Sequence, residues 1–427
     1  MKFTLQAFGS AGDIRPLIAL GGGLRAAGHD VLVLTTPIDN QDYAPLCLGL
    51  GVAHRQVPSS MTLSQATIQD IARLKNGLTM LKRTFEETFL PFVDEMYRVA
   101  LEACRESDAL VSHFSLYSAK AAAIQAGKPH ISVTYWPGSL PSLHLPIEHP
   151  LWGPLFNPLI GKVLEVAFDS FLKRDMTALW ERAGLKPPAH VYPHALFSDE
   201  LNLIPASPLL WQAPPDWSPA HQLCGFFEMP DAAEAWEMPP TLRDFLAEGE
   251  APIYFTFGSM QHIYPEAMRD LFLETARLLG ARAIVQTNRV PTGTRVGEVY
   301  FLDKVPHQRI FEHCRLIVHH GGAGTTQAAI RAGRPSVIVA FNEEQVFWGK
   351  KLAQQGLSPS PLRYQKTTAP QLAGAVRQAS ESMRSKAEAL GHAMREEKGI
   401  ATAVQLIETH LTHHVARTSS PTHQEAP

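Results

Sequence analysis

A short segment near residue 320 limits the possible folds more than any other part of this sequence. The apolar run 316–318 is followed by His319 and His320, then by a glycine-rich turn and by Thr325 and Thr326. This order predicts a buried strand, a tight turn and the N-terminus of a helix. Free amides at a helix N-terminus attract phosphate, and glycines let a ligand approach the backbone closely. The segment therefore predicts a phosphate site in an α/β protein.

Strand–helix–strand alternation occurs in two separate halves of the chain. In the first half, apolar strands are expected at 3–8, 29–35, 109–112 and 130–133 and helices at 17–27, 85–103 and 119–126. In the second half, strands are expected at 253–259, 283–285, 316–318 and 337–339. Such alternation is typical of a parallel sheet covered by helices. A chain of 427 residues exceeds one typical core, so we expect two Rossmann-like domains.

Proline-rich, aperiodic sequence between the two halves marks the expected linker. The predicted units are an N-terminal domain at 1–228, a linker at 229–240, a C-terminal domain at 241–400, a helix at 401–413 and a disordered tail at 414–427.

Charge and cysteine content exclude several functional classes. The 38 basic and 41 acidic residues nearly balance, so no partner of the nucleic-acid class is expected. The four cysteines (Cys47, Cys104, Cys224 and Cys314) lie far apart, which favours reduced thiols over a disulfide framework or a zinc site. No histidine pair has a supporting acid beside it, and His410, His413 and His414 are interpreted as surface residues without a metal. With no membrane-spanning run, we expect a cytoplasmic protein with transient contact at a membrane surface.

Four motifs together resemble one enzyme family. They are the donor-site signature His320-Gly321-Gly322-Ala323-Gly324-Thr325, the N-terminal turn 9–16, the segment 341–349 and the Trp-containing segment 208–227. In this order they are similar to the UDP-glycosyltransferase superfamily, closest to its bacterial and fungal sterol and natural-product branch. The resemblance covers roughly residues 1–395 and implies the GT-B fold, in which two facing Rossmann-like doubly wound domains enclose an interdomain cleft.

The resemblance also implies roles for individual residues. Asp13 would be the general base that activates the acceptor hydroxyl. The donor, a UDP-sugar or dTDP-sugar acting as co-substrate with no further cofactor, would be bound by Ser10, Gly12, Gly258, Ser259, Val305, His307, His320, Gly322, Ala323, Gly324, Thr325, Glu344 and Gln345. Read without the resemblance, Asp13 is equally an N-cap of the helix expected from Pro16 onward.

Some positions depart from the family pattern. Glu344 stands where an Asp is usual, and Ala328 stands where plant members carry an acid that binds the ribose. Because the chain contains no Asp-x-Asp, a metal-bridged diphosphate is not expected. The N-terminal turn lacks the Gly-x-Gly-x-x-Gly spacing of a dinucleotide-binding dehydrogenase.

The acceptor half of the site is less sharply defined. Residues 135–171 and 85–103 are rich in aromatic and aliphatic side chains, which would suit an apolar acceptor or simply pack the core. The acceptor-side candidates are Phe85, Phe89, Tyr135, Trp136 and Leu140. We therefore expect a monomeric or weakly dimeric inverting hexosyltransferase that needs no metal and acts on a lipophilic hydroxyl compound. A nucleotide-sugar epimerase and a non-catalytic nucleotide-binding partner protein are the alternatives.

Overall fold

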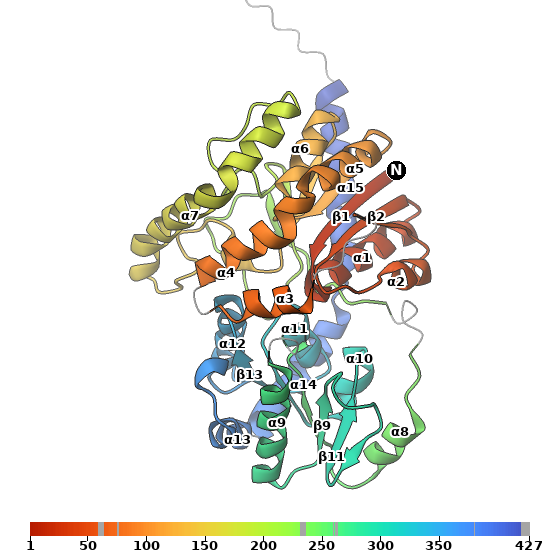
Figure 1. Cartoon of the computed structure of the whole chain (residues 1–427), viewed down its shortest axis with the longest axis vertical. Helices are drawn as coiled ribbons and strands as arrows, with labels where there is room; N and C mark the ends of the chain where they lie inside the picture. Colours follow the sequence, from red (N-terminus) through yellow and green to blue (C-terminus); the bar gives the residue numbers. More distant parts are fainter. Residues whose placement is uncertain are drawn as a thin grey trace, which may run out of the picture.

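The computed structural model of the chain describes residues 1–58, 64–74, 77–230, 236–258, 260, 264–379 and 381–419. Two α/β lobes are stacked along the long axis of the molecule, each built around a seven-stranded sheet (Figure 1). The expected fold class, two Rossmann-like domains in the GT-B arrangement, is confirmed.

The N-terminal lobe contains a sheet whose strand order is β3-β2-β1-β4-β5-β6-β7, and every pair in it is parallel. The strands are β1 (Lys2–Gly9), β2 (Asp30–Pro37), β3 (Ala53–Gln56), β4 (Ala109–His113), β5 (His130–Val133), β6 (Leu201–Ile204) and β7 (His221–Leu223). The α-helices are α1 (Ala11–Ala26), α2 (Ala44–Gly49), α3 (Gln65–Ala72), α4 (Gly77–Thr84), α5 (Val93–Arg105), α6 (Tyr117–Gln125) and α7 (Trp152–Arg182).

Side chains of β1 alternate between the two faces of this sheet, as a buried central strand requires. Phe3, Leu5 and Ala7 belong to the core beneath α1, whereas Phe8 belongs to the core on the α5–α6–α7 face. The N-terminal sheet is therefore covered by helices on both faces.

The C-terminal lobe has the strand order β10-β11-β9-β8-β12-β13-β14, and β10 runs antiparallel to β11. The strands are β8 (Ile253–Phe255), β9 (Ala283–Gln286), β10 (Arg295–Val296), β11 (Val299–Leu302), β12 (Leu316–His319), β13 (Ser336–Ala340) and β14 (Leu362–Arg363). The α-helices are α8 (Pro240–Ala247), α9 (Pro265–Leu279), α10 (His307–Ile310), α11 (Ala323–Arg331), α12 (Glu343–Gln354), α13 (Ala369–Gln378), α14 (Glu381–Glu396) and α15 (Gly399–Ser419).

Each sheet has one point at which its strand order reverses. In the N-terminal lobe, β1 lies between β2 and β4; in the C-terminal lobe, β8 lies between β9 and β12. Ligands of doubly wound sheets bind beyond the carboxyl ends of the strands at such a switch point. The turns after β1 and β4, and those after β8 and β12, are therefore the places to look for a site.

The two lobes are joined by more than the linker. Gln327 of α11 accepts a hydrogen bond from Ser207 N–H (2.8 Å) and donates one to the Pro205 carbonyl (3.0 Å). Helix α15 returns from the lower lobe and packs on the N-terminal sheet through Ala403, Val404 and Ile407 (Figure 1). The end of the chain is therefore part of the N-terminal core.

Some predicted elements have different bounds in the structure. The helix expected at 85–103 is interrupted, with a π-helical turn at Phe85–Phe89 and a 3-10 turn at Leu90–Phe92 before α5, because Pro91 supplies no backbone N–H. Helix α15 is longer than the predicted 401–413: it starts at Gly399 and continues to Ser419, so the start of the predicted disordered tail is wrong for 414–419. Residues 420–427 lie outside the described residues.

The long helix α7 is the main element that the sequence analysis did not predict; it contains Pro158. None of the described helices is long and apolar enough to cross a membrane. All four cysteines are buried free thiols, as expected.

Candidate active site

Asp13 lies in the first turn of α1, directly after the carboxyl end of β1. Its Oδ2 accepts hydrogen bonds from Ser10 N–H (2.9 Å) and from the Ser10 hydroxyl (3.2 Å). Ser10 is the N-cap residue, so the prediction that Asp13 is the N-cap of a helix starting near Pro16 is wrong. Asp13 instead closes a capping box from the third helical position, which leaves part of its carboxylate accessible.

Burial changes the acidity of this carboxylate. Loss of hydration raises the pKa of Asp13 to about 6; the hydrogen bonds from Ser10 oppose this rise and the negative charge of Asp39 adds to it. A carboxylate of this kind is ionised at neutral pH and still able to take a proton, as a general base must.

His113 and Tyr135 complete the surroundings of Asp13. His113 ends β4, and its Nε2 lies 3.8 Å from Asp13 Oδ1 while its Nδ1 is 2.7 Å from the Ser115 hydroxyl. Burial lowers the pKa of His113 to about 3, so the ring is neutral at pH 7. Tyr135 stacks on this ring (centroids 5.7 Å apart) and donates a hydrogen bond to the Asp13 carbonyl (2.9 Å).

The sequence analysis did not identify His113. The signal was available, because His113 follows a strand that the topology places next to β1. Its position more than ninety residues from Asp13 hides this relation until strand order is known.

In the C-terminal lobe, His320 is enclosed by two glycines. A Cβ added to Gly258 would lie 2.8 Å from His320 Cε1, and one added to Gly322 would lie 2.5 Å from His320 Nε2. Gly258 also has a φ of +53°, a conformation that side-chain-bearing residues rarely adopt. These two positions need glycine so that the imidazole can fit between the turns after β8 and β12.

The imidazole of His320 is buried and neutral. Burial lowers its pKa to about 4, and its Nδ1 has no hydrogen-bond partner among the described residues. A buried polar atom of this kind is costly unless a ligand or water satisfies it. His320 therefore fits a ligand that offers hydrogen-bonding oxygens.

Helix α11 begins beside His320 with an unprotected N-terminus. Gly322 is the N-cap residue and, having no side chain, caps no amide. Gly324 is exposed and a Cβ there would meet nothing within 4 Å, while Thr325 is buried. The first amides of α11, including those of Ala323 and Gly324, therefore present positive partial charge to an open space, an arrangement that can accommodate a phosphate group.

Glu344 faces Asp13 from the opposite lobe. Burial, together with the negative charge of Asp13, raises the pKa of Glu344 to about 7. The two carboxylates, which come from different lobes, therefore lie close enough for their charges to interact. Gln345 is buried, and its Oε1 accepts a hydrogen bond from Phe341 N–H (2.7 Å), so it also supports the start of α12. Glu343 is exposed and pairs with Arg363 (2.8 Å), so it is not grouped with Glu344 and Asp13.

The segment predicted to bind the nucleobase, around Val305 and His307, lies near His320. Val305 is buried and His307 starts α10, where its ring stacks on Phe311 (centroids 4.5 Å apart). Burial, together with smaller effects of the charges of Arg15 and His320, lowers the pKa of His307 to about 3. Arg15 belongs to α1, so this segment also faces the N-terminal lobe. Ser259 lies outside the described residues.

The acceptor-side candidates fall into two groups. Phe85, Phe89 and Leu140 are buried in the core, where Phe89 contacts the rings of Phe8 and Tyr117. Tyr135 and Trp136 are half-buried and lie just beyond the carboxyl end of β5. The tight packing of the first group explains their aromatic and aliphatic character. Tyr135 and Trp136 also pack against the core but stay partly accessible.

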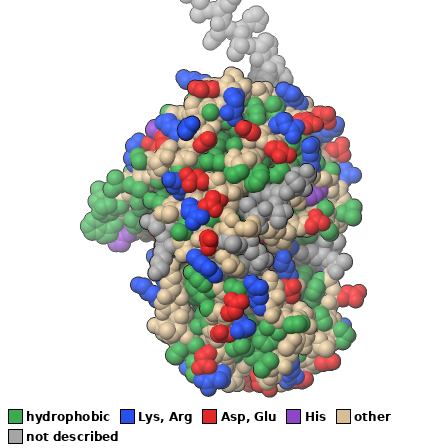
Figure 2. Space-filling view, in the orientation of Figure 1, with side chains coloured by type: hydrophobic (Ala, Val, Ile, Leu, Met, Phe, Trp, Pro, Cys, Tyr) green, Lys and Arg blue, Asp and Glu red, His purple; other side chains and the backbone are tan. Residues whose placement is uncertain are grey.

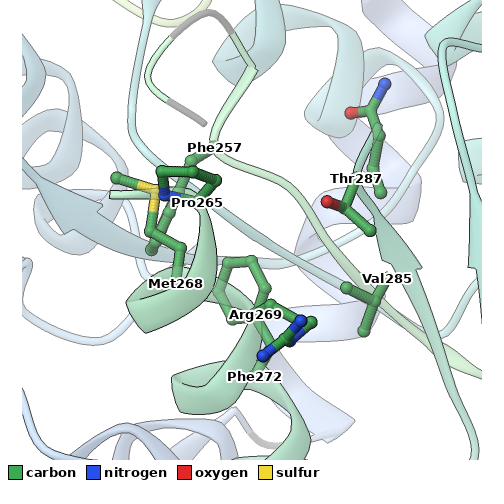
Figure 3. Close-up of a pocket in the computed structure, with 8 residues that line it drawn as sticks. Phe257, Pro265, Met268, Arg269, Phe272, Val285 and Thr287 are labelled. Carbon is green, nitrogen blue, oxygen red and sulfur yellow. The ribbon is translucent and has the colours of Figure 1, made fainter. Parts of the chain in front are cut away.

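A separate small pocket lies in the C-terminal lobe, between the start of α9 and the end of β9 (Figure 3). Met268 and Phe272 of α9 line it together with Val285 and Thr287. None of its lining residues is one of the candidate site residues, so we do not assign the reaction to it.

The interpretation of the C-terminal histidines as residues without a supporting acid is wrong. His410 and His414 lie one helical turn apart on α15, and both approach the carboxylate of Glu200. The acid comes from a segment 210 residues away in the sequence, so no local pattern could reveal it.

Residues 271–405 match the family model described as the C-terminal domain of erythromycin biosynthesis protein CIII-like proteins. Over 423 residues the chain is 30% identical to the O-mycaminosyltylonolide 6-deoxyallosyltransferase of Streptomyces fradiae, covering 96% of this chain and 97% of that protein. It is 29% identical to a sterol 3-beta-glucosyltransferase of Arabidopsis thaliana, covering 96% of this chain and 66% of that longer protein.

Solved structures show the same fold. The glycosyltransferase of kitacinnamycin superposes with a TM-score of 0.69 at 19% identity, covering 96% of this chain and 98% of that one. The glycosyltransferase VinC, solved in complex with dTDP, gives a TM-score of 0.65 at 18% identity, covering 97% of this chain and all of VinC (100%).

Proposed function

The chain belongs to the UDP-glycosyltransferase superfamily and is a glycosyltransferase that uses a nucleotide sugar, and from this premise we propose how its cleft performs the transfer. Asp13 activates a hydroxyl of a hydrophobic acceptor, and the turns after β8 and β12 bind the nucleoside diphosphate of the donor. The observation that carries the proposal is an ionisable carboxylate at the switch point of one sheet and an uncapped helix N-terminus at that of the other, with Glu344 of the C-terminal lobe near enough to Asp13 for their charges to interact.

Transfer begins with the proton of the acceptor hydroxyl. Asp13 takes this proton as the hydroxyl oxygen forms a bond to the anomeric carbon of the sugar. Neutral His113, held by Ser115, lies next to Asp13 and orients the carboxylate or the incoming hydroxyl. With Asp13 acting only as a base, the hydroxyl displaces the diphosphate in a single step, from the side opposite to the leaving group. The configuration at the anomeric carbon is therefore inverted.

The departing diphosphate gains negative charge as the glycosidic bond breaks. The amides of Ala323, Gly324 and Thr325, the helix dipole of α11 and the imidazole of His320 stabilise that charge. These groups replace the divalent ion that a metal-bridged diphosphate would need, so we propose that transfer proceeds without one.

Val305 and His307 contact the nucleobase of the donor, and Glu344 binds hydroxyls of its sugar. A Glu344 carboxyl with a pKa of about 7 can either donate or accept such a hydrogen bond. The donor is a UDP- or dTDP-linked hexose; the relative in complex with dTDP supports a nucleotide of this class.

The acceptor is a lipophilic alcohol such as a sterol, polyketide, terpenoid or hydroxylated lipid. The names of the relatives, a macrolide-type deoxyallosyltransferase and a sterol glucosyltransferase, support this class. Tyr135, which is half-buried and hydrogen-bonded to Asp13, and the adjacent half-buried Trp136 supply an apolar contact for this acceptor.

An exposed apolar stripe on α7 supports transient membrane contact. Trp152, Leu155, Phe156, Leu159, Val163 and Val166 recur at helical spacing and are each more than 40% exposed. Figure 2 shows hydrophobic side chains gathered at the projecting left edge of the molecule, where Figure 1 places the start of α7. We propose a cytoplasmic monomer or weak homodimer that touches a lipid surface through this stripe.

Vesicle sedimentation tests the stripe. The double variant Leu155→Glu, Leu159→Glu should lose binding to phosphatidylcholine vesicles, whereas Leu48→Glu, at an isolated exposed leucine on α2, should keep it. Equal sedimentation of the two variants would remove α7 from the proposal.

Mass spectrometry after incubation with paired panels of nucleotide sugars and lipophilic alcohols tests the reaction itself. A product heavier by one hexosyl unit, formed equally in EDTA and in magnesium, is expected. A change in the nucleotide sugar without acceptor would indicate the epimerase alternative, and no reaction despite nucleotide binding would indicate the non-catalytic partner. The transferases found among the relatives favour neither alternative.

A further inference from the structure

Three potential metal ligands meet on the N-terminal lobe, outside the candidate active site. The carboxylate of Glu200 and the imidazoles of His410 and His414 place one ligand atom each within 4.8 Å of the others. Glu200 directly precedes β6, whereas the two histidines lie four residues apart on α15. That spacing puts both imidazoles on one face of the helix, turned toward the same acid.

The separations between these atoms are close to those around a bound zinc ion. His410 Nε2 lies 2.9 Å and His414 Nδ1 lies 3.7 Å from the same Glu200 oxygen, Oε2. Two ligands of a tetrahedral zinc ion, each bonded at about 2.0–2.1 Å, are about 3.3 Å apart. Of these two separations, one must therefore lengthen and the other shorten by about 0.4 Å. The two imidazole nitrogens, which lie within 4.8 Å of each other, must reach the same spacing, and side-chain rotation can provide these changes.

The three side chains are held in place and remain reachable. Their exposed fractions are 13% for His410, 30% for His414 and 38% for Glu200. An ion can thus enter from solvent, and water can occupy the coordination positions that the protein leaves open.

The cluster is at the opposite edge of the sheet from Asp13. Glu200 lies before the first residue of β6, at the amino ends of the parallel strands, and Asp13 follows the carboxyl end of β1. Helix α15 is already attached to the lobe by Glu408, whose carboxylate is 2.8 Å from His29 Nε2, and by Ile400, which packs against Gly23. The cluster adds a third attachment nearer the end of the helix (Figure 1).

We propose that Glu200, His410 and His414 bind one divalent transition-metal ion of the zinc class, and that the ion fixes the end of α15 to the N-terminal lobe. Two imidazoles and one carboxylate suit zinc, nickel or copper far better than magnesium or calcium, which prefer oxygen ligands. The bound ion links the last helix of the chain to the strand β6. The site is structural and takes no part in glycosyl transfer.

Calorimetry with the full chain, carrying no affinity tag, tests this site with zinc chloride as the probe. The wild-type protein should bind one zinc ion per chain, and magnesium chloride should give no comparable binding. His414→Ala should weaken zinc binding at least about tenfold. This variant keeps the hydrogen bond between His410 and Glu200, so the docking of α15 does not depend on the lost side chain.

His413→Ala is the matched control, because His413 is an exposed neighbour on the same helix and does not belong to the cluster. It should bind zinc as the wild type does. Zinc should raise the thermal midpoint of the wild type and of His413→Ala, but not that of His414→Ala or Glu200→Gln. Equal zinc affinity in His414→Ala and the wild type, or no zinc binding by the wild type, would overturn the proposal. Both readouts are independent of transfer activity, so the proposed reaction can fail without affecting this test.

Discussion

The two switch points share a topology and differ in how the following helix starts. After β1, the start of the helix α1 is satisfied by two carboxylates: Asp13 accepts the Ser10 amide and Asp39 accepts the Ala11 amide. After β12, the helix α11 starts at Gly322 with no side chain over its amides. The first helix end has its positive charge satisfied from within the protein, and the second offers that charge to a ligand.

Because of this difference, the same strand–turn–helix arrangement can serve two tasks in the reaction, proton acceptance in one lobe and diphosphate binding in the other. A carboxylate that caps a helix is fixed in position and can receive a proton from a neighbouring hydroxyl. An uncapped helix end binds a diphosphate and stabilises it as it leaves. The charge of Asp13 affects the pKa of Glu344, so Glu344 of the C-terminal lobe lies near the carboxylate of the N-terminal lobe.

Replacing the carboxylate of the capped turn should have the largest effect. Asp13→Asn removes the base but keeps a side-chain oxygen that can accept the Ser10 N–H hydrogen bond of the capping box. We expect turnover to fall about a hundredfold or more, with nucleotide affinity and thermal stability nearly unchanged. Steady-state kinetics with a true acceptor measures this. Turnover close to that of the wild type would leave Asp13 as a cap alone and remove the asymmetry between the two turns.

The uncapped turn should respond through donor binding. His320→Ala removes a buried hydrogen-bonding group from a charged ligand, a loss of about 10- to 100-fold in affinity for UDP or dTDP. Transfer should slow in parallel, because the diphosphate is present in both the ground state and the transition state. Calorimetry with the free nucleotide provides the measurement, with His313→Ala, at an exposed histidine of the same lobe, as the control. Unchanged affinity together with full activity would place the donor elsewhere.

The pH dependence of the reaction tests whether Asp13 is the base of the capped turn. A base with a pKa of about 6 is about nine tenths ionised at pH 7 and about one tenth ionised at pH 5. The value of kcat/KM should therefore fall about tenfold from pH 7 to pH 5. Glu344 titrates near pH 7, so the same profile must be recorded for Glu344→Gln. If the acid limb disappears in that variant, it belongs to Glu344 and not to Asp13.

The glycine that borders His320 should give the smallest effect. Gly258→Ala places a methyl group against the His320 ring and strains a left-handed backbone, so we expect nucleotide affinity to fall several-fold. Gly280→Ala is a matched control: its φ of +57° imposes the same backbone strain, but nothing lies within 4 Å of the added Cβ. Calorimetry should separate the two variants. An equal loss of affinity would mean that backbone strain, and not the position of His320, causes the effect.

Much of the fold could be predicted from local patterns. The strands β1, β4, β5 and β12 were expected almost as they are, since apolar runs ending in Gly, Ser or His identify buried parallel strands. Helix boundaries were harder, because Pro16 and Pro158 lie inside α1 and α7 and are tolerated there by the surrounding packing. The sequence also could not separate Phe85 and Phe89, which fill the core, from Tyr135 and Trp136, which border the cleft.

The sequence by itself determined the helix starts that carry the chemistry. A capping Ser10 and Asp13, and a bare Gly322 before α11, are local features that depend on a few adjacent residues. Only the tertiary structure decided which distant residues join them. His113 reaches Asp13 because β4 pairs with β1, and Glu200 reaches His410 because α15 returns to the first sheet. Strand order and helix return depend on the burial of whole surfaces, and this information is distributed over the entire chain.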